Sequence, residues 1–392
     1  MNPPSRGLPR TALVLFGLFV FVLILWPLTH PTSEATLRLT SLYQSRLSSQ
    51  LSEDTLVPLE DAGERPEAWW RDITIVYSWV NGSEPTYLED KARFMGANAG
   101  VNRARDDGLF RYSVRSITRY MPWHKGEIVL LSKRNHIPDW IDTTNPRFRH
   151  VAEEDIIPKE ALPTFDSNII ESYLHRIPGL SNRFLYLNDD FFLARAAPPD
   201  TFFTAPGGVK LFREWTDART REGDDDWTVS NKYTAKLIED EYGTLRDGAL
   251  RIPAHAPYAF LRNSLRNLHA HPRFGPALKK TLSHHTRSAE DINVHILHAA
   301  YTMFDKHVPS DLTAVVDDKH EARFIAWTAW LEDNAAAIEN VIANPPYFFN
   351  INDELPSGSA ADKPLEQLHG FMDRMYPMPS WLEKTETERE HE

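Results

Sequence analysis

The chain has no cysteine among its 392 residues. This absence excludes disulfides, thiolate nucleophiles, cysteine-based zinc sites and iron–sulfur clusters. A surplus of positive charge is also missing, because 43 lysines and arginines face 55 aspartates and glutamates, which gives a net charge of −12. A chain this acidic lacks the basic surface that nucleic-acid binding requires, so no nucleic-acid partner is expected.

Several signatures of common catalytic sites are missing as well: the P-loop, HExxH, GxSxG and GxGxxG. The sequence therefore carries no signature of a P-loop nucleotide hydrolase, an HExxH metalloprotease, a GxSxG hydrolase or a GxGxxG dinucleotide-binding protein. The composition is that of a globular chain, with 42% hydrophobic and 25% charged residues. The length predicts one large domain or two ordinary ones.

One long hydrophobic run lies near the N-terminus, from Thr11 to Leu28, and it carries no charge. A helix of that length spans roughly 27 Å, close to the thickness of a thin bilayer. Two arginines precede the run, which predicts a membrane anchor with the N-terminus in the cytosol and the rest of the chain in the lumen. A cleaved signal peptide is the alternative, because the string SEA at 33–35 has a small-x-small pattern.

The main part of the chain alternates strand-like and helical patterns. The β-branched and aromatic run at 72–82 ends in Asn-Gly, which predicts a buried strand and a turn. Other strands are predicted at 126–132, 148–157 and 183–193, and helices at 106–120, 169–177, 232–242, 258–268, 289–304 and 322–342. The alternation predicts an α/β fold, with a mixed, largely parallel sheet followed by a mainly helical part.

Two adjacent carboxylates are the strongest candidate for chemistry. Asp189 and Asp190 follow one hydrophobic segment and precede another. Ligands bind at the carboxyl ends of strands in α/β sheets, and Mg²⁺ favours one or two carboxylates together with phosphate oxygens. The pair predicts a site for Mg²⁺ or Mn²⁺ that neutralises a diphosphate. A solvated turn is the alternative.

A second candidate is a stripe of arginines, Arg111, Arg115 and Arg119, spaced four residues apart on a predicted helix. Like charges at this spacing repel each other, so the stripe requires an anion. Protein carboxylates or a phosphate group can supply it, and the sequence leaves both open.

A third candidate combines two distant segments. His255 lies between two prolines, which predicts a loop, and Arg287 precedes a predicted helix start capped by Ser288. An arginine beside a helix N-terminus suits a phosphate or an oxyanion. Asp291 and His295 would share a face of that helix and offer two metal ligands, or act simply as a cap and a solvated histidine. A lone glycosylation sequon, Asn81-Gly82-Ser83, lies at a strand end, which favours a site role over a glycan.

These segments resemble, in order, the conserved regions of the Stealth family. DITIVYSWVNGSEP (72–85) is similar to the first region. RARDDGLFRYSVRSI and LPTFDSNIIESYLHRIPGLSNRFLYLNDDFFL, within 103–195, are similar to the second. IPAHAPY and HHTRSAED, within 227–305, resemble the third, and PPYFFNINDE (345–354) resembles the fourth. In its short length, the chain resembles compact fungal or microbial members of the family.

The family contains microbial capsular hexose-1-phosphate transferases and the α/β subunit precursor of N-acetylglucosamine-1-phosphotransferase. The resemblance implies that a sugar 1-phosphate, N-acetylglucosamine 1-phosphate, moves from a UDP-sugar to a hydroxyl of a glycan or glycoprotein, and that UMP is released. A metal-dependent glycosyltransferase that releases UDP, and a non-catalytic glycan- or nucleotide-sugar-binding protein, are the alternatives.

The resemblance also assigns residues. Glu171, Asp190, His255 and Arg287 match family active-site positions, with His255 or Glu171 as the general base. Asp189 and Asp190 would hold the metal. Expected substrate-binding residues are Trp79, Asn81, Arg105, Arg111, Arg115, Asn188, Asn231 and Asp291.

The expected organisation follows from these segments. It comprises a cytosolic tail (1–10), a transmembrane anchor (11–28), a stem (29–67), a Stealth-type catalytic domain (68–354) and a loose polar tail (355–392). The expected location is a Golgi or other secretory-pathway membrane, single-pass type II, with the catalytic domain in the lumen. A homodimer is left open.

Overall fold

The computed structural model describes residues 68–385, apart from 96–104, 106, 206, 311 and 318–320. The predicted cytosolic tail, anchor and stem lie outside the described residues. Within the described part, no helix is long and apolar enough to cross a membrane.

The main sheet has five strands in the order β3-β2-β1-β4-β8. Its strands are β1 (Thr74–Ser78), β2 (Ile128–Ser132), β3 (Phe148–Ala152), β4 (Arg183–Asn188) and β8 (Tyr258–Leu261). The first four are mutually parallel, and β8 runs antiparallel to β4. Strand β2 is buried along its whole length, as expected for a parallel strand covered on both faces. The predicted α/β fold with a largely parallel sheet is confirmed.

The predicted strand at 183–193 is divided between two sheets. After Asp189 and Asp190 the chain continues as β5 (Phe191–Leu193), which pairs antiparallel with β11 (Phe348–Asp353). Strand β11 pairs in parallel with β10 (Ala322–Trp327). The two aspartates therefore occupy the joint between two sheets.

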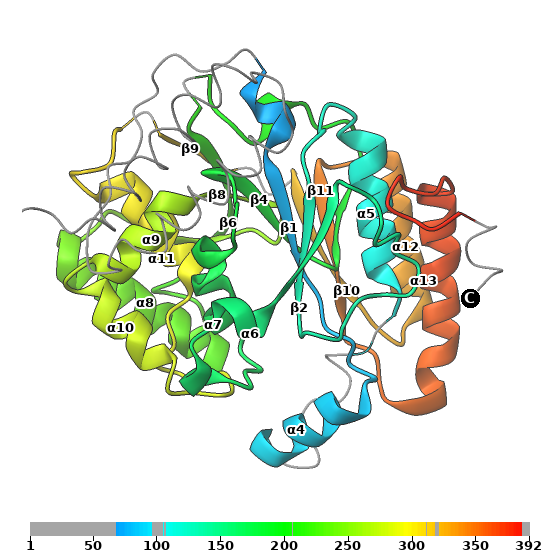
Figure 1. The fold of residues 1–392 in the computed structure, drawn as a ribbon, viewed down its shortest axis with the longest axis horizontal. Coiled ribbons are helices and arrows are strands. Elements are labelled where there is room, and N and C mark those ends of the chain that lie inside the picture. Colours follow the sequence, from blue (N-terminus) through cyan, green and yellow to red (C-terminus); the bar gives the residue numbers. More distant parts are fainter. Residues whose placement is uncertain are drawn as a thin grey trace, which may run out of the picture. The chain divides into compact units, whose positions relative to one another are not determined.

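A third sheet has the order β7-β6-β9. Its strands are β6 (Val209–Asp217), β7 (Arg251–Pro253) and β9 (Thr313–Val316). The helices are α4 (Pro85–Met95), α5 (Leu109–Tyr120), α6 (Glu153–Ile156), α7 (Ser167–Ser172), α8 (Asp226–Tyr242), α9 (Arg262–Ala270), α10 (Phe274–Thr281), α11 (Val294–Phe304), α12 (Leu331–Ala343) and α13 (Asp362–Met375). Figure 1 shows α8 to α11 gathered on one side of the sheets, and α5, α12 and α13 on the other.

Helix α5 forms where the sequence predicts it. Gly108 precedes the helix with a φ of +74°, a backbone conformation that suits glycine. Phe110, Val114 and Ile117 are spaced to share one face, and all three are buried. Ser113 on the same face lies 2.9 Å from the Tyr77 hydroxyl of β1, oxygen to oxygen. The helix is thereby fixed to the main sheet.

The part predicted as mainly helical contains strands that the prediction missed. The predicted helices at 258–268 and 322–342 each begin with a strand, β8 and β10, before α9 and α12 follow. Both strands are short and rich in aromatic residues, a composition that favours strands. Along β10, Ile325 and Trp327 are buried whereas Phe324 is exposed, which is the alternation of a strand.

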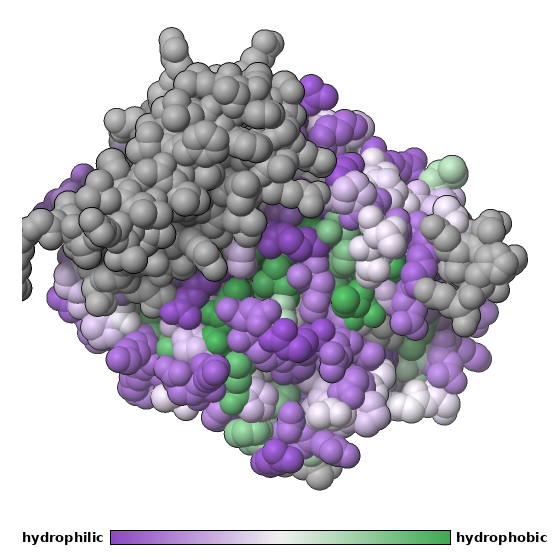
Figure 2. All heavy atoms as spheres, viewed as in Figure 1, coloured by the Kyte–Doolittle hydropathy of each residue, from purple (hydrophilic) through white to green (hydrophobic). Residues whose placement is uncertain are grey.

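The predicted loose tail is wrong for residues 355–385. Helix α13 buries Leu368, Phe371 and Met372 in a second core shared with Trp327 and Phe349. The segment reads as polar because its apolar residues are spaced three and four apart, on one face of an amphipathic helix. On the surface drawn in Figure 2, hydrophobic side chains are confined to patches surrounded by hydrophilic ones.

Candidate active site

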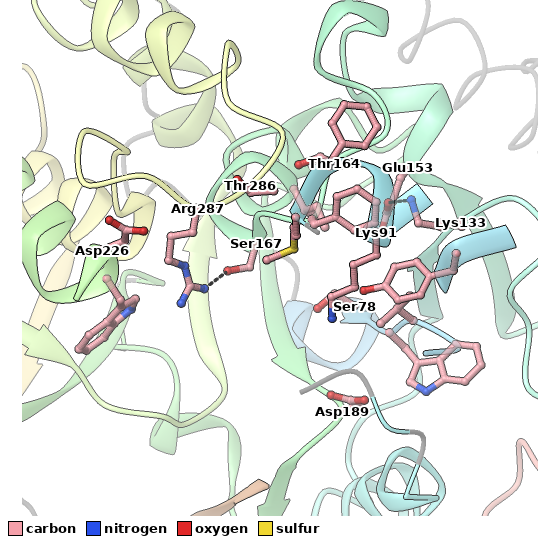
Figure 3. A pocket seen from close by; sticks show the side chains of 18 of the residues that line it. Ser78, Lys91, Lys133, Glu153, Thr164, Ser167, Asp189, Asp226, Thr286 and Arg287 are labelled. Carbon is pink, nitrogen blue, oxygen red and sulfur yellow. Dashed lines mark hydrogen bonds and ion pairs between the residues drawn. The ribbon is translucent and has the colours of Figure 1, made fainter. Parts of the chain in front are cut away.

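A cavity of about 860 Å³ lies at the carboxyl ends of the parallel strands. Trp79 follows β1, Lys133 follows β2, Glu153 follows β3 and Asp189 follows β4, and all four line it (Figure 3). Ligands of α/β proteins bind at this edge of the sheet. The side chains here include a cation, two carboxylates and an aromatic ring.

Arg287 lines the same cavity from the loop that precedes α11 (Figure 3). Its Nη2 donates to Ser167 Oγ at 3.2 Å, and its Nε lies 4.0 Å from Asp166 Oδ1. Burial and the neighbouring carboxyl of Asp291 raise the pKa of Asp166 to about 7. Below that pH, Asp166 is largely protonated and therefore neutral. The positive charge of Arg287 is then mostly unbalanced and can attract an anion in the cavity.

Lys133 also faces the cavity, between two aromatic rings. Its Nζ lies 5.8 Å from the ring centroid of Tyr87 and 5.4 Å from that of Phe165. The same nitrogen is 3.9 Å from Glu153 Oε2. Burial raises the pKa of Glu153 to about 7, although Lys133 opposes the shift. Because Glu153 is only partly ionised near neutral pH, it balances the charge of Lys133 weakly. Lys133 is therefore a second cation that suits a phosphate group.

The joint between β4 and β5 faces two cavities. Asp189 lines the large cavity and also a smaller one of about 230 Å³, which Asp190, Arg105 and Asn352 line too. Asp190 Oδ1 is buried and has no hydrogen-bond partner among the described residues. Burial raises the pKa of Asp190 to about 6, while His255 and Asn350 lower it. An unpartnered carboxylate oxygen beside a second carboxylate suits a hard cation.

The protein supplies few ligands for such a cation. In the part of the chain that the structure describes, no group of three or more histidine, aspartate or glutamate side chains is placed to hold a metal. The two aspartates fit Mg²⁺ or Mn²⁺ only where substrate oxygens complete the coordination, which is the usual arrangement for Mg²⁺ with a diphosphate.

His255 lies in the loop between β7 and β8, as predicted. Its Nδ1 is 3.7 Å from Glu214 Oε1, and its ring contacts those of Phe191 and Phe324 edge-on. Its charge lowers the pKa of Asp190, so the two groups act on each other. The structure thus brings together two residues that are 65 positions apart in the chain.

Glu171 is buried on α7 behind these groups. Its Oε1 accepts from the Tyr186 hydroxyl at 3.2 Å, and its Oε2 lies 2.9 Å from His295 Nε2. The ring of Tyr258 lies against His295, with centroids 3.8 Å apart. Burial and the charges of Glu171, Glu214 and Asp190 all raise the pKa of the Tyr258 hydroxyl, so these three carboxylates surround one phenol.

Comparison with known proteins identifies the family of the chain. Three family models match the chain: Stealth protein CR1, conserved region 1, over residues 71–99; CR2, conserved region 2, over 103–211; and CR3, conserved region 3, over 254–304. The chain is a member of the Stealth family. The matched regions contain the joint of β4 and β5, His255 and Arg287.

Relatives of this Stealth protein have names from polysaccharide synthesis. An exopolysaccharide phosphotransferase of Streptomyces coelicolor is 32% identical over 329 residues, 80% of this chain and 53% of the relative. A capsular polysaccharide phosphotransferase of Actinobacillus pleuropneumoniae is 32% identical over 234 residues, 57% of this chain and 62% of the relative. The chain spans about half the length of the first of these.

A solved galactosyltransferase in complex with donor and acceptor sugar analogs is similar in structure. It has 12% sequence identity and a TM-score of 0.40, and the match covers 78% of this chain and 98% of that one.

The arginine stripe of this Stealth protein binds protein carboxylate, the first of the two alternatives. Arg115 donates to both oxygens of Glu383, Nε to Oε1 at 2.7 Å and Nη2 to Oε2 at 2.8 Å. Arg111 bonds to the same carboxylate, and Arg119 donates to the carbonyl of Met375. The expectation that Arg111 and Arg115 bind substrate is therefore corrected, because both pair with one carboxylate, 272 and 268 residues further along the chain.

Arg105 lines both cavities, as a substrate-binding residue would. Its Nη2 donates to the Pro356 carbonyl at 2.9 Å, and its Nη1 lies 3.7 Å from Asp353 Oδ2. Residues 353–356 thus anchor an arginine that faces the candidate site, a role that the expected tail did not include.

Other expected positions make hydrogen bonds within the protein. Asn231 is fully buried and accepts from Asn293 Nδ2 at 2.9 Å, away from either cavity. Asn293, not Ser288, caps α11, because its side chain accepts from the first turn of that helix. Asn81 accepts from the Ser83 amide at 3.1 Å and closes a local turn. Asn188 accepts from Ser78 Oγ at 3.3 Å, at the end of β4.

Asp291 and His295 do not share a site. Asp291 is fully buried, and its Oδ1 lies 2.6 Å from His284 Nδ1, whereas His295 pairs with Glu171. No partner of Glu171 could be predicted from local sequence. The sequence feature that could have indicated a role for His295 is its place on a helix that is otherwise mostly apolar, VHILHAAY, where a buried polar side chain needs a hydrogen-bond partner.

Proposed function

We propose that this Stealth protein transfers a sugar 1-phosphate from a nucleoside diphosphate sugar to a hydroxyl of a glycan. The observation that carries the proposal is the joint of β4 and β5. Asp189 faces a cavity lined by Arg287 and Lys133, and Asp190 beside it interacts with His255. One turn thus connects a site for a diphosphate with a titratable group suited to proton transfer. The phosphotransferase names of the relatives support the same reaction.

The large cavity would hold the donor. Phosphoryl transfer depends on positioning and charge neutralisation more than on covalent chemistry. Arg287 and Lys133 would bind the oxygens of the diphosphate, and Trp227 in the same lining offers an aromatic surface for the nucleoside. Trp79 also lines the cavity but is 6% exposed. UDP-N-acetylglucosamine is the proposed donor, from the family resemblance.

His255 is the proposed general base. Its side chain is 31% exposed, and its buried Nδ1 has no hydrogen-bond partner among the described residues, whereas both carboxylate oxygens of Glu171 are already engaged. Imidazole titrates near neutrality, which suits proton abstraction. Glu171 would orient the site through His295 and Tyr186.

The reaction then balances as follows. The acceptor oxygen forms a bond to the β-phosphorus, its proton passes to His255, and the bond from that phosphorus to the bridging oxygen breaks. UMP leaves, and the product is a phosphodiester. Asp189 and Asp190 would hold Mg²⁺ or Mn²⁺, which neutralises diphosphate charge when bound.

The proposal extends to location. The charge-free run at 11–28 would hold the chain in a Golgi or other secretory-pathway membrane, with the site in the lumen. Sequencing the N-terminus of protein from its native host tests this, and a mature chain that begins near Thr36 would contradict it.

The released nucleotide tests the reaction. The full chain is incubated with UDP-N-acetylglucosamine, a panel of methyl hexosides and Mg²⁺ or Mn²⁺, and the products are separated. UMP together with a sugar–phosphate–sugar product is expected. UDP with a phosphate-free disaccharide would show a glycosyltransferase instead. Binding of the nucleotide sugar without any turnover would show a binding protein.

A further inference from the structure

An exposed aromatic ring lies beside His255. Phe324 on β10 is 50% exposed, and its ring centroid is 5.5 Å from that of His255, edge to face. It is not part of the lining of the large cavity. Phe191, which directly follows Asp189 and Asp190, packs edge-on against the His255 ring, and His255 in turn packs against Phe324.

The strand around Phe324 presents a face that suits a sugar. Phe324 is opposite Asn350 in the register of β10 and β11, and Ala326 is opposite Asn352. Paired residues of neighbouring strands share a face of the sheet. On that face the Phe324 ring and Ala326 are exposed, Asn352 is partly buried and Asn350 is fully buried. A sugar presents C–H groups on its ring face and hydroxyls at its edge, which match an aromatic surface with one accessible amide, that of Asn352, on the same face.

We propose that Phe324 stacks against the acceptor sugar ring whose hydroxyl receives the phosphoryl group. This inference rests on the proposed function. A general base must lie within about 3 Å of the oxygen that it deprotonates. The ring that carries this hydroxyl must then lie next to His255, where Phe324 offers an exposed apolar surface. Phe324 binds the acceptor and takes no part in bond making.

Three variants test the inference in the full chain: Phe324→Ala, Phe324→Trp and the control Trp330→Ala. Trp330 is also an exposed aromatic, 72% exposed, and it precedes α12 rather than lying beside His255. With UDP-N-acetylglucosamine and a methyl hexoside, Phe324→Ala is expected to raise the KM for the hexoside about tenfold. The KM for the donor and the kcat at saturating hexoside should stay within about twofold. Phe324→Trp should restore the hexoside KM, and Trp330→Ala should leave it unchanged.

An unchanged hexoside KM in Phe324→Ala would overturn the inference, as would an equal rise in the donor KM. Thermal melts of each variant check folding. If Phe324→Ala melts early, Phe324→Leu takes its place, because leucine keeps apolar bulk but lacks a flat face, and the same KM rise is expected.

Binding separates this inference from the proposed function. If the wild-type chain turns over no nucleotide sugar, the hexosides are titrated by NMR against wild type and Phe324→Ala. Weaker binding to the variant would support the saccharide surface although the transfer reaction has failed. Equal binding would overturn the surface itself.

Discussion

The arginine stripe of α5 and the single Arg287 were both candidates for binding an anion, and the fold treats them differently. Arg115 on α5 is 9% exposed and bonded to both oxygens of Glu383. Arg287 is 34% exposed, bonded to one hydroxyl, and faces a cavity. The carboxyl nearest to Arg287, Asp166, has its pKa raised to about 7.

The difference lies in the protonation of the partner. Burial would raise the pKa of Glu383, but hydrogen bonds from Arg115 and from the Ser380 amide lower it below its ordinary value. Glu383 is therefore ionised and pairs with Arg115 and Arg111, whereas Asp166, which is buried beside Asp291, pairs only weakly with Arg287. A cation is available to a ligand only where the protein leaves its charge unbalanced.

Arg287→Ala should give the largest effect. We expect kcat/KM for UMP release to fall about a thousandfold, because a cation on the transferred phosphoryl group contributes on this scale. The melting temperature should hardly change, since the side chain makes one bond to Ser167. Arg273→Ala is the matched control, an exposed arginine paired with Glu241. Unchanged turnover in Arg287→Ala would remove Arg287 from the site.

The pH dependence of stability should have opposite signs in the two regions. The folded-state pKa of Asp166, about 7, lies above its ordinary 3.8. Folded protein therefore binds more protons between these values, and the free energy of unfolding falls as pH rises from about 4 to 7, by up to about 4 kcal/mol. Asp166→Asn should reduce that slope, and the raised pKa values of Glu153 and Asp190 should account for the slope that is left.

Glu383 should act in the other direction. Its pKa is lowered in the fold, so its contribution to stability is present above pH 4.5 and is lost as pH falls below it. Glu383→Gln should flatten the acid limb of the stability curve and leave the slope between pH 4 and 7 intact. Urea denaturation from pH 3 to 8 measures both variants, and slopes of the same sign in both regions would contradict the comparison.

Arg115→Met should destabilise the fold without touching the chemistry. It keeps the apolar stem and leaves a buried carboxylate with one partner fewer, which costs about 3 kcal/mol. We expect wild-type kcat in the folded fraction, measured by UMP release well below the denaturation midpoint. A fall in kcat without a loss of stability would return Arg115 to the site.

Arg111→Ala should have the smallest effect. Its side chain is 29% exposed and Glu383 keeps the bidentate pair with Arg115, so a loss of about 0.5 kcal/mol is expected. Urea denaturation measures it beside Arg115→Met. A loss as large as that of Arg115→Met would mean that the two arginines act as one unit.

The sequence predicted what depends on local pattern. The strand before Asp189, the helix after Gly108 and the loop of His255 all follow from hydrophobic periodicity, glycine and proline within a few residues. Strand β10 was missed because its aromatic residues continue directly into the pattern of the helix that follows. Helix α13 was missed because an amphipathic helix has a polar composition when its two faces are averaged.

The partners could not be predicted, because they are long-range. Glu171 meets His295, and Arg115 meets Glu383, only after the chain has folded. Charge spacing marked the arginine stripe correctly but could not identify its anion. The sequence identified Asp189 and Asp190 as a pair of acids at a candidate site. It did not show that the chain changes sheet at this pair, because β4 and β5 look like one apolar run interrupted by these residues.

The bond between Arg115 and Glu383 also sets an order of events during synthesis. Translation adds about 5–20 residues per second, so the 268 positions between the two residues take on the order of 10–50 s. Throughout that interval, the nascent chain has the arginines of α5 but not the glutamate that pairs with Arg115 and Arg111. The turn that contains Glu383 therefore completes this contact last. A chain stalled on the ribosome before residue 383 would leave these arginines able to bind another anion.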